Sequence, residues 1–172
     1  ALEGAEDGEL FASGMAAIST VMLGLLSNGD HVVASADVYG GPYGLMTEEL
    51  PRFGINVTMA DMQDPTSYEA AIQENTKMLY IETLSNPVLK VCDVEAMSTI
   101  ARKHNLLLVI DNTFTSPWGC QPVAMGCDLV IHSTTKYLGG HSDIVGGAVV
   151  GRKDLIAELF PKKIHFGGAP DP

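Results

Sequence analysis

The chain has 172 residues, of which 46% are hydrophobic and 18% are charged, a composition typical of one globular domain and unlike that of a disordered or fibrous chain. Ten Lys plus Arg stand against 21 Asp plus Glu, so the net charge is −11 at pH 7. Such an acidic chain lacks the positive charge with which proteins neutralise nucleic-acid phosphates or anionic lipid. The composition therefore argues against nucleic acid as a partner and favours a small molecule.

The cysteines and the hydropathy of the chain indicate a cytoplasmic protein. Cys92, Cys120 and Cys127 are an odd number without the CxxC spacing of metal sites, so we expect neither a disulfide framework nor a bound metal. The first ten residues carry four acidic side chains and no basic one, unlike the start of a secretory signal. The apolar runs fall short of the ~20 residues that a membrane span needs, and we expect no membrane partner.

Short runs rich in Val, Ile and Leu alternate with helical patterns, which is typical of an α/β fold. In chain order, the sequence predicts a helix over 16–26, a strand over 31–35, a helix over 44–53, a strand over 55–60, a helix over 67–75, a strand over 78–82, a helix over 94–104, strands over 106–111, 129–132 and 147–151, and a helix over 153–160. Asp64-Pro65 marks the start of the third helix, Asp93 caps the fourth, and Pro161 stops the last. The strand runs are almost wholly apolar, so we expect a parallel sheet that is covered on both faces.

A first candidate site lies at Ser13-Gly14-Met15, directly before the helix predicted over 16–26. Small residues at a helix start leave backbone N–H groups free, and the helix dipole adds positive potential, so this segment can bind a phosphate. The alternative is an ordinary N-cap serine. The segment alone does not decide between the two.

A second candidate, Asp111, ends the apolar run 106–110. A carboxylate at the tip of such a strand is costly unless a cation or a hydrogen-bond donor meets it, and a protonated ring nitrogen is one such partner. The alternative is an Asp that caps the next turn. Asp111-Asn112-Thr113 fits both interpretations.

A third candidate is Lys136, within His132-Ser133-Thr134-Thr135-Lys136-Tyr137 and shortly before Gly139-Gly140-His141-Ser142-Asp143. Hydroxyls and glycines around a lysine just beyond a buried strand indicate a binding site and not a solvated surface. A lysine that attacks a carbonyl carbon must be partly neutral, which desolvation or neighbouring cations achieve. The hydroxyls of Ser133 and Thr135 can meanwhile hold a phosphate.

The fourth candidates, Tyr39 and Asn86, follow the strands predicted over 31–35 and 78–82. An aromatic ring can cover a planar cofactor, and an Asn can hydrogen-bond a ring substituent, although each segment alone reads as a simple turn. A phosphate site, an aromatic cover, an Asn, a buried carboxylate and a lysine together are the parts that a site for pyridoxal 5'-phosphate (PLP) requires.

Three ordered blocks carry a resemblance to a known family: 132–137 with 140–143, 109–114, and 82–87. With them the chain resembles, from Ser13 to about Gly151, the Cys/Met-metabolism (transsulfuration) family of PLP-dependent enzymes, which includes cystathionine γ-synthases and γ-lyases. The resemblance implies the large PLP-binding domain of the type I transferase fold, three-layer α/β/α with a mostly parallel central sheet. PLP is the cofactor that it implies.

The resemblance also implies a role for each candidate residue. Lys136 would bind the cofactor and then move protons, with Tyr39 stacked over the ring and assisting, and Asp111 would pair with the pyridine nitrogen. The phosphate would be held by the backbone of Gly14 and Met15 and by the hydroxyls of Ser133 and Thr135. The remaining ring contacts would come from Asn86, at the ring hydroxyl, and from Thr113, at the cofactor face.

The family builds its sites from several segments, and this chain matches only one of them. The resemblance implies that residues 1–172 are the PLP-binding domain of a longer chain, without the N-terminal arm and the C-terminal small domain, and that the whole protein is a homotetramer, a dimer of dimers. Its substrate would be an amino acid, either a sulfur amino acid or a homoserine ester, in β- or γ-elimination or γ-replacement. Gly41 stands where methionine γ-lyases usually carry Cys, which counts against that activity.

Two alternatives to this function stay open at the level of sequence. The chain by itself could be a cofactor-binding fragment without catalysis of its own, or the full-length protein could act like a methionine γ-lyase or an O-acetylhomoserine sulfhydrylase. A cysteine desulfurase or an aminotransferase is a more distant alternative, against which the block 133–137 argues.

Overall fold

The fold is built around one seven-stranded sheet in a computed structural model that describes residues 1–170. The strand order is β1-β7-β6-β5-β4-β2-β3, with the bounds β1 Asp7–Phe11, β2 His31–Ser35, β3 Asn56–Ala60, β4 Thr76–Glu82, β5 Leu107–Asp111, β6 Leu129–Ser133 and β7 Gly147–Gly151. Neighbouring strands from β3 to β6 pair in parallel, whereas β7 is antiparallel to both β6 and β1. The sheet is therefore mostly parallel, as the sequence predicts.

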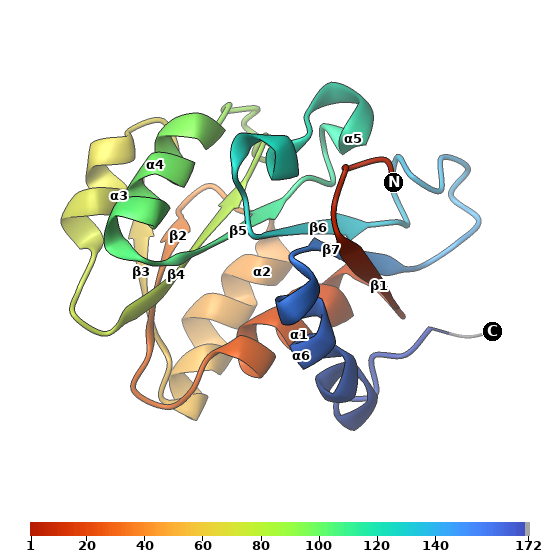
Figure 1. The fold of residues 1–172 in the computed structure, drawn as a ribbon, viewed down its shortest axis with the longest axis horizontal. Coiled ribbons are helices and arrows are strands. Elements are labelled where there is room, and N and C mark those ends of the chain that lie inside the picture. The colour runs from red at the N-terminus through yellow and green to blue at the C-terminus, as the bar shows by residue number, and fades with distance from the viewer. Residues whose placement is uncertain (171–172) are drawn as a thin grey trace.

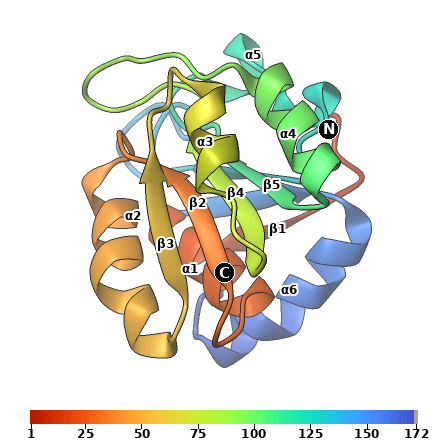
Figure 2. The ribbon, with the colours of Figure 1, turned by 90° about the vertical axis from the view of Figure 1, so that its left-hand side faces the viewer.

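Helices cover both faces of the sheet, so the fold has three layers (Figure 1 and Figure 2). One face carries α1, α2 and α6, and the other carries α3, α4 and α5. The bounds are α1 Gly14–Leu25, α2 Gly40–Gly44, η1 Leu45–Glu49, η2 Leu50–Phe53, α3 Pro65–Ala71, α4 Val94–His104, α5 Ser116–Gly119, η3 Pro122–Met125 and α6 Lys153–His165. The predicted three-layer α/β/α fold is confirmed.

Each face of the sheet has its own hydrophobic core, because alternate residues of one strand point to opposite sides. Tyr80 and Val109 pack with α1 and α6, whereas Leu79 and Leu108 pack with α3 and α4. All five residues of β2 are buried, which explains why its centre, Val32-Val33-Ala34, is apolar and does not alternate.

Several predicted elements match the structure closely. The strands over 31–35 and 147–151 and the helix over 94–104 have the predicted bounds, and the Asp93 side chain accepts a hydrogen bond from the Ala96 N–H. The helix predicted over 67–75 begins earlier, at Pro65, because Asp64 is its N-cap and accepts from the Thr66 N–H. The helix predicted over 44–53 is instead a chain of short pieces, α2, η1 and η2, that starts at Gly40.

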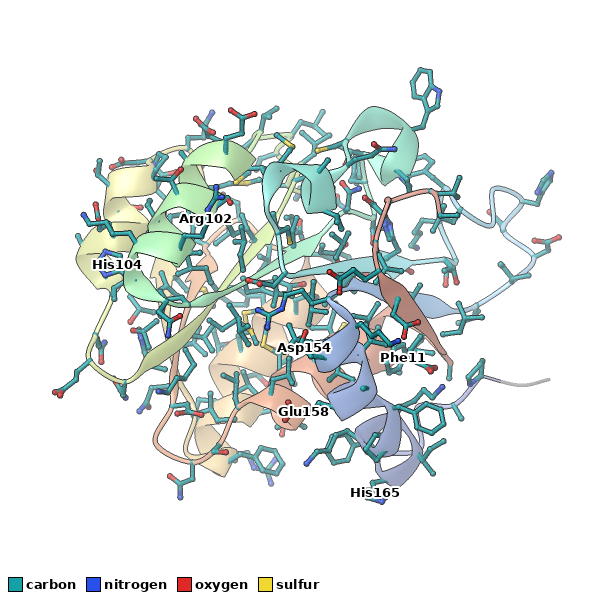
Figure 3. All side chains as sticks on the ribbon, in the orientation of Figure 1. Phe11, Arg102, His104, Asp154, Glu158 and His165 are labelled. Atoms are coloured by element: carbon teal, nitrogen blue, oxygen red, sulfur yellow. The ribbon has the colours of Figure 1, made fainter. Side chains whose placement is uncertain are left out.

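The prediction that Pro161 ends the last helix is wrong, since α6 continues through it to His165. Proline removes one backbone hydrogen bond, but tertiary contacts of the following turn compensate. Lys163 is buried, forms an ion pair with Glu9 of β1, and its ammonium lies 5.9 Å from the centre of the Phe11 ring of the same strand. Figure 3 shows His165 at the far end of the same helix.

The N-terminal residues form an edge strand, β1, for which the sequence analysis predicts no element. Phe11 pairs with Gly147 and Asp7 with Gly151 in antiparallel register, and the Lys153 N–H donates to a Glu6 carboxylate oxygen at 2.9 Å. The segment Asp7–Phe11 does not alternate regularly between polar and apolar residues, so its sequence does not predict a strand. Pairing with the distant strand β7 determines its conformation.

Within the described residues, no helix is both long and apolar enough to cross a bilayer. The same part of the chain has no group of three or more His, Cys, Asp or Glu arranged to hold a metal ion. The three cysteines carry free thiols, and Cys92 and Cys127 are buried.

Candidate active site

The residues that the sequence singles out meet in one cavity of about 760 Å³. It lies at the carboxyl ends of β4, β5 and β6 and at the start of α1, which is where open parallel sheets bind ligands. All nine predicted site residues line it: Gly14, Met15, Tyr39, Asn86, Asp111, Thr113, Ser133, Thr135 and Lys136.

The N-terminus of α1 forms one wall of this cavity. The Ser13 hydroxyl accepts a hydrogen bond from the Ala16 N–H at 3.0 Å, so Ser13 is an N-cap, one of the two interpretations that the sequence left open. The amides of Gly14 and Met15 stand in the first turn, where the helix itself offers them no acceptor. The cap therefore fixes a helix start whose free N–H groups suit an anion.

Gly14 lets this helix start approach β6 closely. A Cβ atom at Gly14 would lie 2.8 Å from the Ser133 Cβ and 3.0 Å from its hydroxyl oxygen, and the first distance is shorter than real contacts allow. The absence of a side chain thus brings the Ser133 hydroxyl next to the first turn of α1. Backbone and hydroxyl donors converge there on one small volume.

Asp111 is the last residue of β5, and its carboxyl group reaches the cavity. One carboxylate oxygen accepts a hydrogen bond from the Thr113 N–H at 2.9 Å, so Asp111 does cap the next turn. Burial raises the pKa of Asp111, with the hydrogen bonds to Thr113 acting in the opposite direction. A cationic group placed in the cavity would stabilise the ionised carboxylate.

Thr113 joins the ends of β5 and β6. Its hydroxyl oxygen accepts a hydrogen bond from the Ser133 N–H at 2.7 Å. The loop that leaves β6 is then closed by the Thr135 hydroxyl, which accepts from the Gly146 N–H at 3.0 Å and lies 3.2 Å from the Gly146 carbonyl oxygen. Of the two hydroxyls predicted to hold a phosphate, that of Thr135 is thus already engaged within its own loop.

Lys136 follows this turn, with its backbone N–H bonded to the Ser133 carbonyl at 3.1 Å. The residue is exposed in the cavity. Its amine shares the cavity with Asp111 and with the start of α1. A lysine, a carboxylate and an anion site therefore face one common space.

Sequence reasoning missed two parts of this cavity. Phe114 and Tyr137 form an edge-to-face aromatic pair, with ring centres 5.9 Å apart, and both line the wall beside Lys136. Glu82, at the tip of β4, is buried and also lines the cavity. The signal for Glu82 was available, because a carboxylate that ends an apolar run is the same pattern that singled out Asp111.

Comparison with known proteins reveals close relatives. A family model described as "Cys/Met metabolism PLP-dependent enzyme" matches residues 1–172. The chain is 51% identical over 172 residues to a cystathionine gamma-lyase of Bacillus subtilis, a match that covers 99% of this chain and 45% of that protein. It is 49% identical to a cystathionine beta-lyase of Staphylococcus haemolyticus, with 92% of this chain and 41% of that protein covered.

A solved structure agrees with these matches. The crystal structure of a cystathionine gamma-lyase from Lactobacillus plantarum, complexed with L-serine, superposes with a TM-score of 0.95 at 42% sequence identity. The match covers 99% of this chain and 45% of the other. The chain thus spans about half the length of the relatives that it matches.

Proposed function

Because the chain belongs to the Cys/Met metabolism family of PLP-dependent enzymes, we propose that residues 1–172 are the cofactor-binding domain of a transsulfuration enzyme. The reaction is a β- or γ-elimination or a γ-replacement on a sulfur amino acid or a homoserine ester. The observation that carries the proposal is the convergence of Lys136, Asp111 and the start of α1 on one cavity.

The donor set of the cavity fits PLP, the cofactor of the family. The free amides at the start of α1 and the adjacent Ser133 hydroxyl suit a phosphate. The cavity of about 760 Å³ lies within the range of small-molecule and cofactor sites. When bound, PLP supplies a protonated pyridine ring that stabilises negative charge developing on the substrate carbon atoms.

Each of the following site residues then has a role. The Lys136 amine would hold the cofactor and, once released, accept and return the proton of the substrate Cα. Asp111 would keep the ring nitrogen protonated. Burial disfavours the ionised form of the Asp111 carboxyl, and the cationic ring nitrogen would stabilise that form. Tyr39 would cover the ring, and Asn86 and Thr113 would orient it.

The remaining parts of the proposal concern the whole protein. Relatives about twice as long as this chain support further segments in the whole protein. By the resemblance, these segments would hold the substrate carboxylate and complete the phosphate site. A tetramer with an amino-acid substrate follows from the resemblance described above. Three free thiols are consistent with a cytoplasmic location.

The test uses the full-length protein that contains these residues. Incubation with PLP, reduction with borohydride and peptide mapping by mass spectrometry should give one adduct, on Lys136, and none in a Lys136→Ala variant. Lys90, which forms an ion pair with Asp37, serves as an internal control lysine that stays unmodified. A folded protein that takes up PLP without an adduct on Lys136 would refute the assignment.

The products that the full-length protein forms from cystathionine distinguish the possible reactions. With uptake of one water, cleavage of the sulfur–Cγ bond gives cysteine, ammonia and a four-carbon keto acid, whereas cleavage of the sulfur–Cβ bond gives homocysteine, ammonia and pyruvate. Either pair of products supports a transsulfuration lyase. A chain that only exchanges amino groups with a keto acid would instead be an aminotransferase.

A further inference from the structure

Glu82 is a buried carboxylate that lines the proposed cofactor site, and none of the roles proposed above belongs to it. Its side chain lies at the tip of β4 and is only 6% exposed. Burying a carboxylate costs free energy unless hydrogen bonds or charges compensate. The groups that meet this carboxylate therefore show what it does.

The Glu82 carboxyl accepts a hydrogen bond from the backbone of the loop between β2 and α2. The Tyr39 N–H donates to Oε1 of Glu82 at 2.8 Å, although 43 residues separate the two in the chain. Tyr39 follows β2, and β2 pairs in parallel with β4. The bond thus ties the loop between β2 and α2 to the end of the neighbouring strand.

This bond matters because the Tyr39 side chain itself is weakly packed. It is 55% exposed, although the preceding Val38 is buried in the core, and the Tyr39 side chain makes no cap hydrogen bond to α2. The backbone of Asn86 also lies near enough to the Glu82 carboxyl to lower its pKa. The one geometric hydrogen bond of this carboxyl to a residue that we assign to the cofactor ring is the bond from Tyr39.

The surroundings of Glu82 are short of positive charge at close range. Burial raises the pKa of Glu82 to about 7, Asp111 acts in the same direction, and the N–H groups of Tyr39 and Asn86 lower it. Asp111 faces Glu82 directly in the register of β4 and β5. Other ionisable groups in the same region include Tyr80 of β4, Tyr39 and Lys136 in the cavity wall, and Lys90 with its ion-pair partners Asp37 and Asp61.

A buried carboxylate whose hydrogen-bond donor is the backbone N–H of a distant loop residue has the geometry of a positioning group. We propose that Glu82 is a positioning residue whose Oε1 holds the backbone of Tyr39, and thereby sets the Tyr39 ring over the cofactor site. The inference rests on the proposed function for the role of Tyr39. The hold on the loop is a property of this chain alone.

Two substitutions separate this role from packing. Glu82→Gln keeps an oxygen acceptor for the Tyr39 N–H and nearly the same shape. Glu82→Met keeps the volume but removes the acceptor and also the buried charge, so a purely structural role predicts an equal or more stable protein. Glu48→Met, at an exposed position in η1, is the matched control.

The measurement is hydrogen exchange of the Tyr39 amide in the full-length, cofactor-free protein, resolved by fragmentation in the mass spectrometer. We expect protection to fall at least tenfold in Glu82→Met and to stay within about threefold of wild type in Glu82→Gln and Glu48→Met. The dissociation constant of PLP should rise at least fivefold in Glu82→Met alone, with global stability unchanged or higher.

The two proposals fail in different ways. Unchanged protection of the Tyr39 amide in Glu82→Met would overturn the positioning role, whatever the protein does with PLP. Absence of a Lys136 adduct in the wild type would overturn the proposed function and leave the exchange result to be judged by itself. If Glu82→Met does not fold, Glu82→Leu replaces it, and a loss of folding in both overturns the inference in favour of a structural role.

Discussion

The burial of Glu82 has a measurable consequence for the stability of the protein. The pKa of this carboxyl rises from 4.5 to about 7 in the folded state, mainly because burial disfavours the charge. A carboxyl with a raised pKa binds its proton more tightly in the folded state than in the unfolded state. The free energy of unfolding therefore falls as the pH rises from 4.5 through 7.

The size of this effect follows from the shift. A change of about 2.5 pKa units at about 1.36 kcal/mol each gives roughly 3 kcal/mol, which the folded protein loses between pH 4.5 and pH 8 because of Glu82. Glu82→Gln carries no such charge and retains an acceptor for the Tyr39 N–H. The variant should thus gain stability relative to wild type as the pH rises, by up to about 3 kcal/mol at pH 8.

Urea unfolding followed by circular dichroism at pH 5, 6, 7 and 8 measures this difference, at one fixed protein concentration because assembly also contributes to stability. Glu158→Gln, an exposed position on α6 marked in Figure 3, controls for the loss of one surface carboxylate. A difference between Glu82→Gln and wild type that is flat from pH 5 to pH 8 would show that the folded pKa of Glu82 is not raised.

Two further predictions concern the start of α1 and of α4. Gly14→Ala should weaken the binding of PLP at least tenfold, since its Cβ would lie 2.8 Å from the Ser133 Cβ and push the helix start away; absorbance titration with PLP checks this, and unchanged affinity would contradict it. Asp93→Ala removes the side-chain acceptor of the Ala96 N–H and should cost about 1 kcal/mol in urea unfolding, whereas Asp93→Asn should cost much less.

The central strands of the fold could be predicted because their signal is local. The apolar runs that became β2 and β4 are buried on both faces, so composition alone identifies them. The edge strand β1 has no such signal, since residues as polar as Asp7 and Glu9 acquire strand geometry only by pairing with β7. Pro161 failed as a stop signal for a related reason, because the contacts of Lys163 with Glu9 and Phe11 come from tertiary structure.

The candidate site was more predictable than its internal bonds. Lys136 and Asp111 stood out as polar residues that end or follow buried strands, and the parallel sheet brings such positions together at one edge. The bond between Tyr39 and Glu82 joins two different βα loops. A backbone N–H carries no residue-specific signal in a sequence, so no pattern could pair it with a carboxylate 43 positions away.

The edge strand β1 also protects the sheet from unwanted association. β7 is rich in glycine and valine, and it offers β1 a full row of backbone partners from Gly147 to Gly151. If β1 detached, that row would be open to strands of other molecules, which is a common route to aggregation. The outer strand itself carries the exposed Asp7, whose negative charge repels a second copy of the same edge, whereas the charge of Glu9 is compensated by Lys163. The acidity of the chain thus acts at one of the two edges of the sheet, the other being β3.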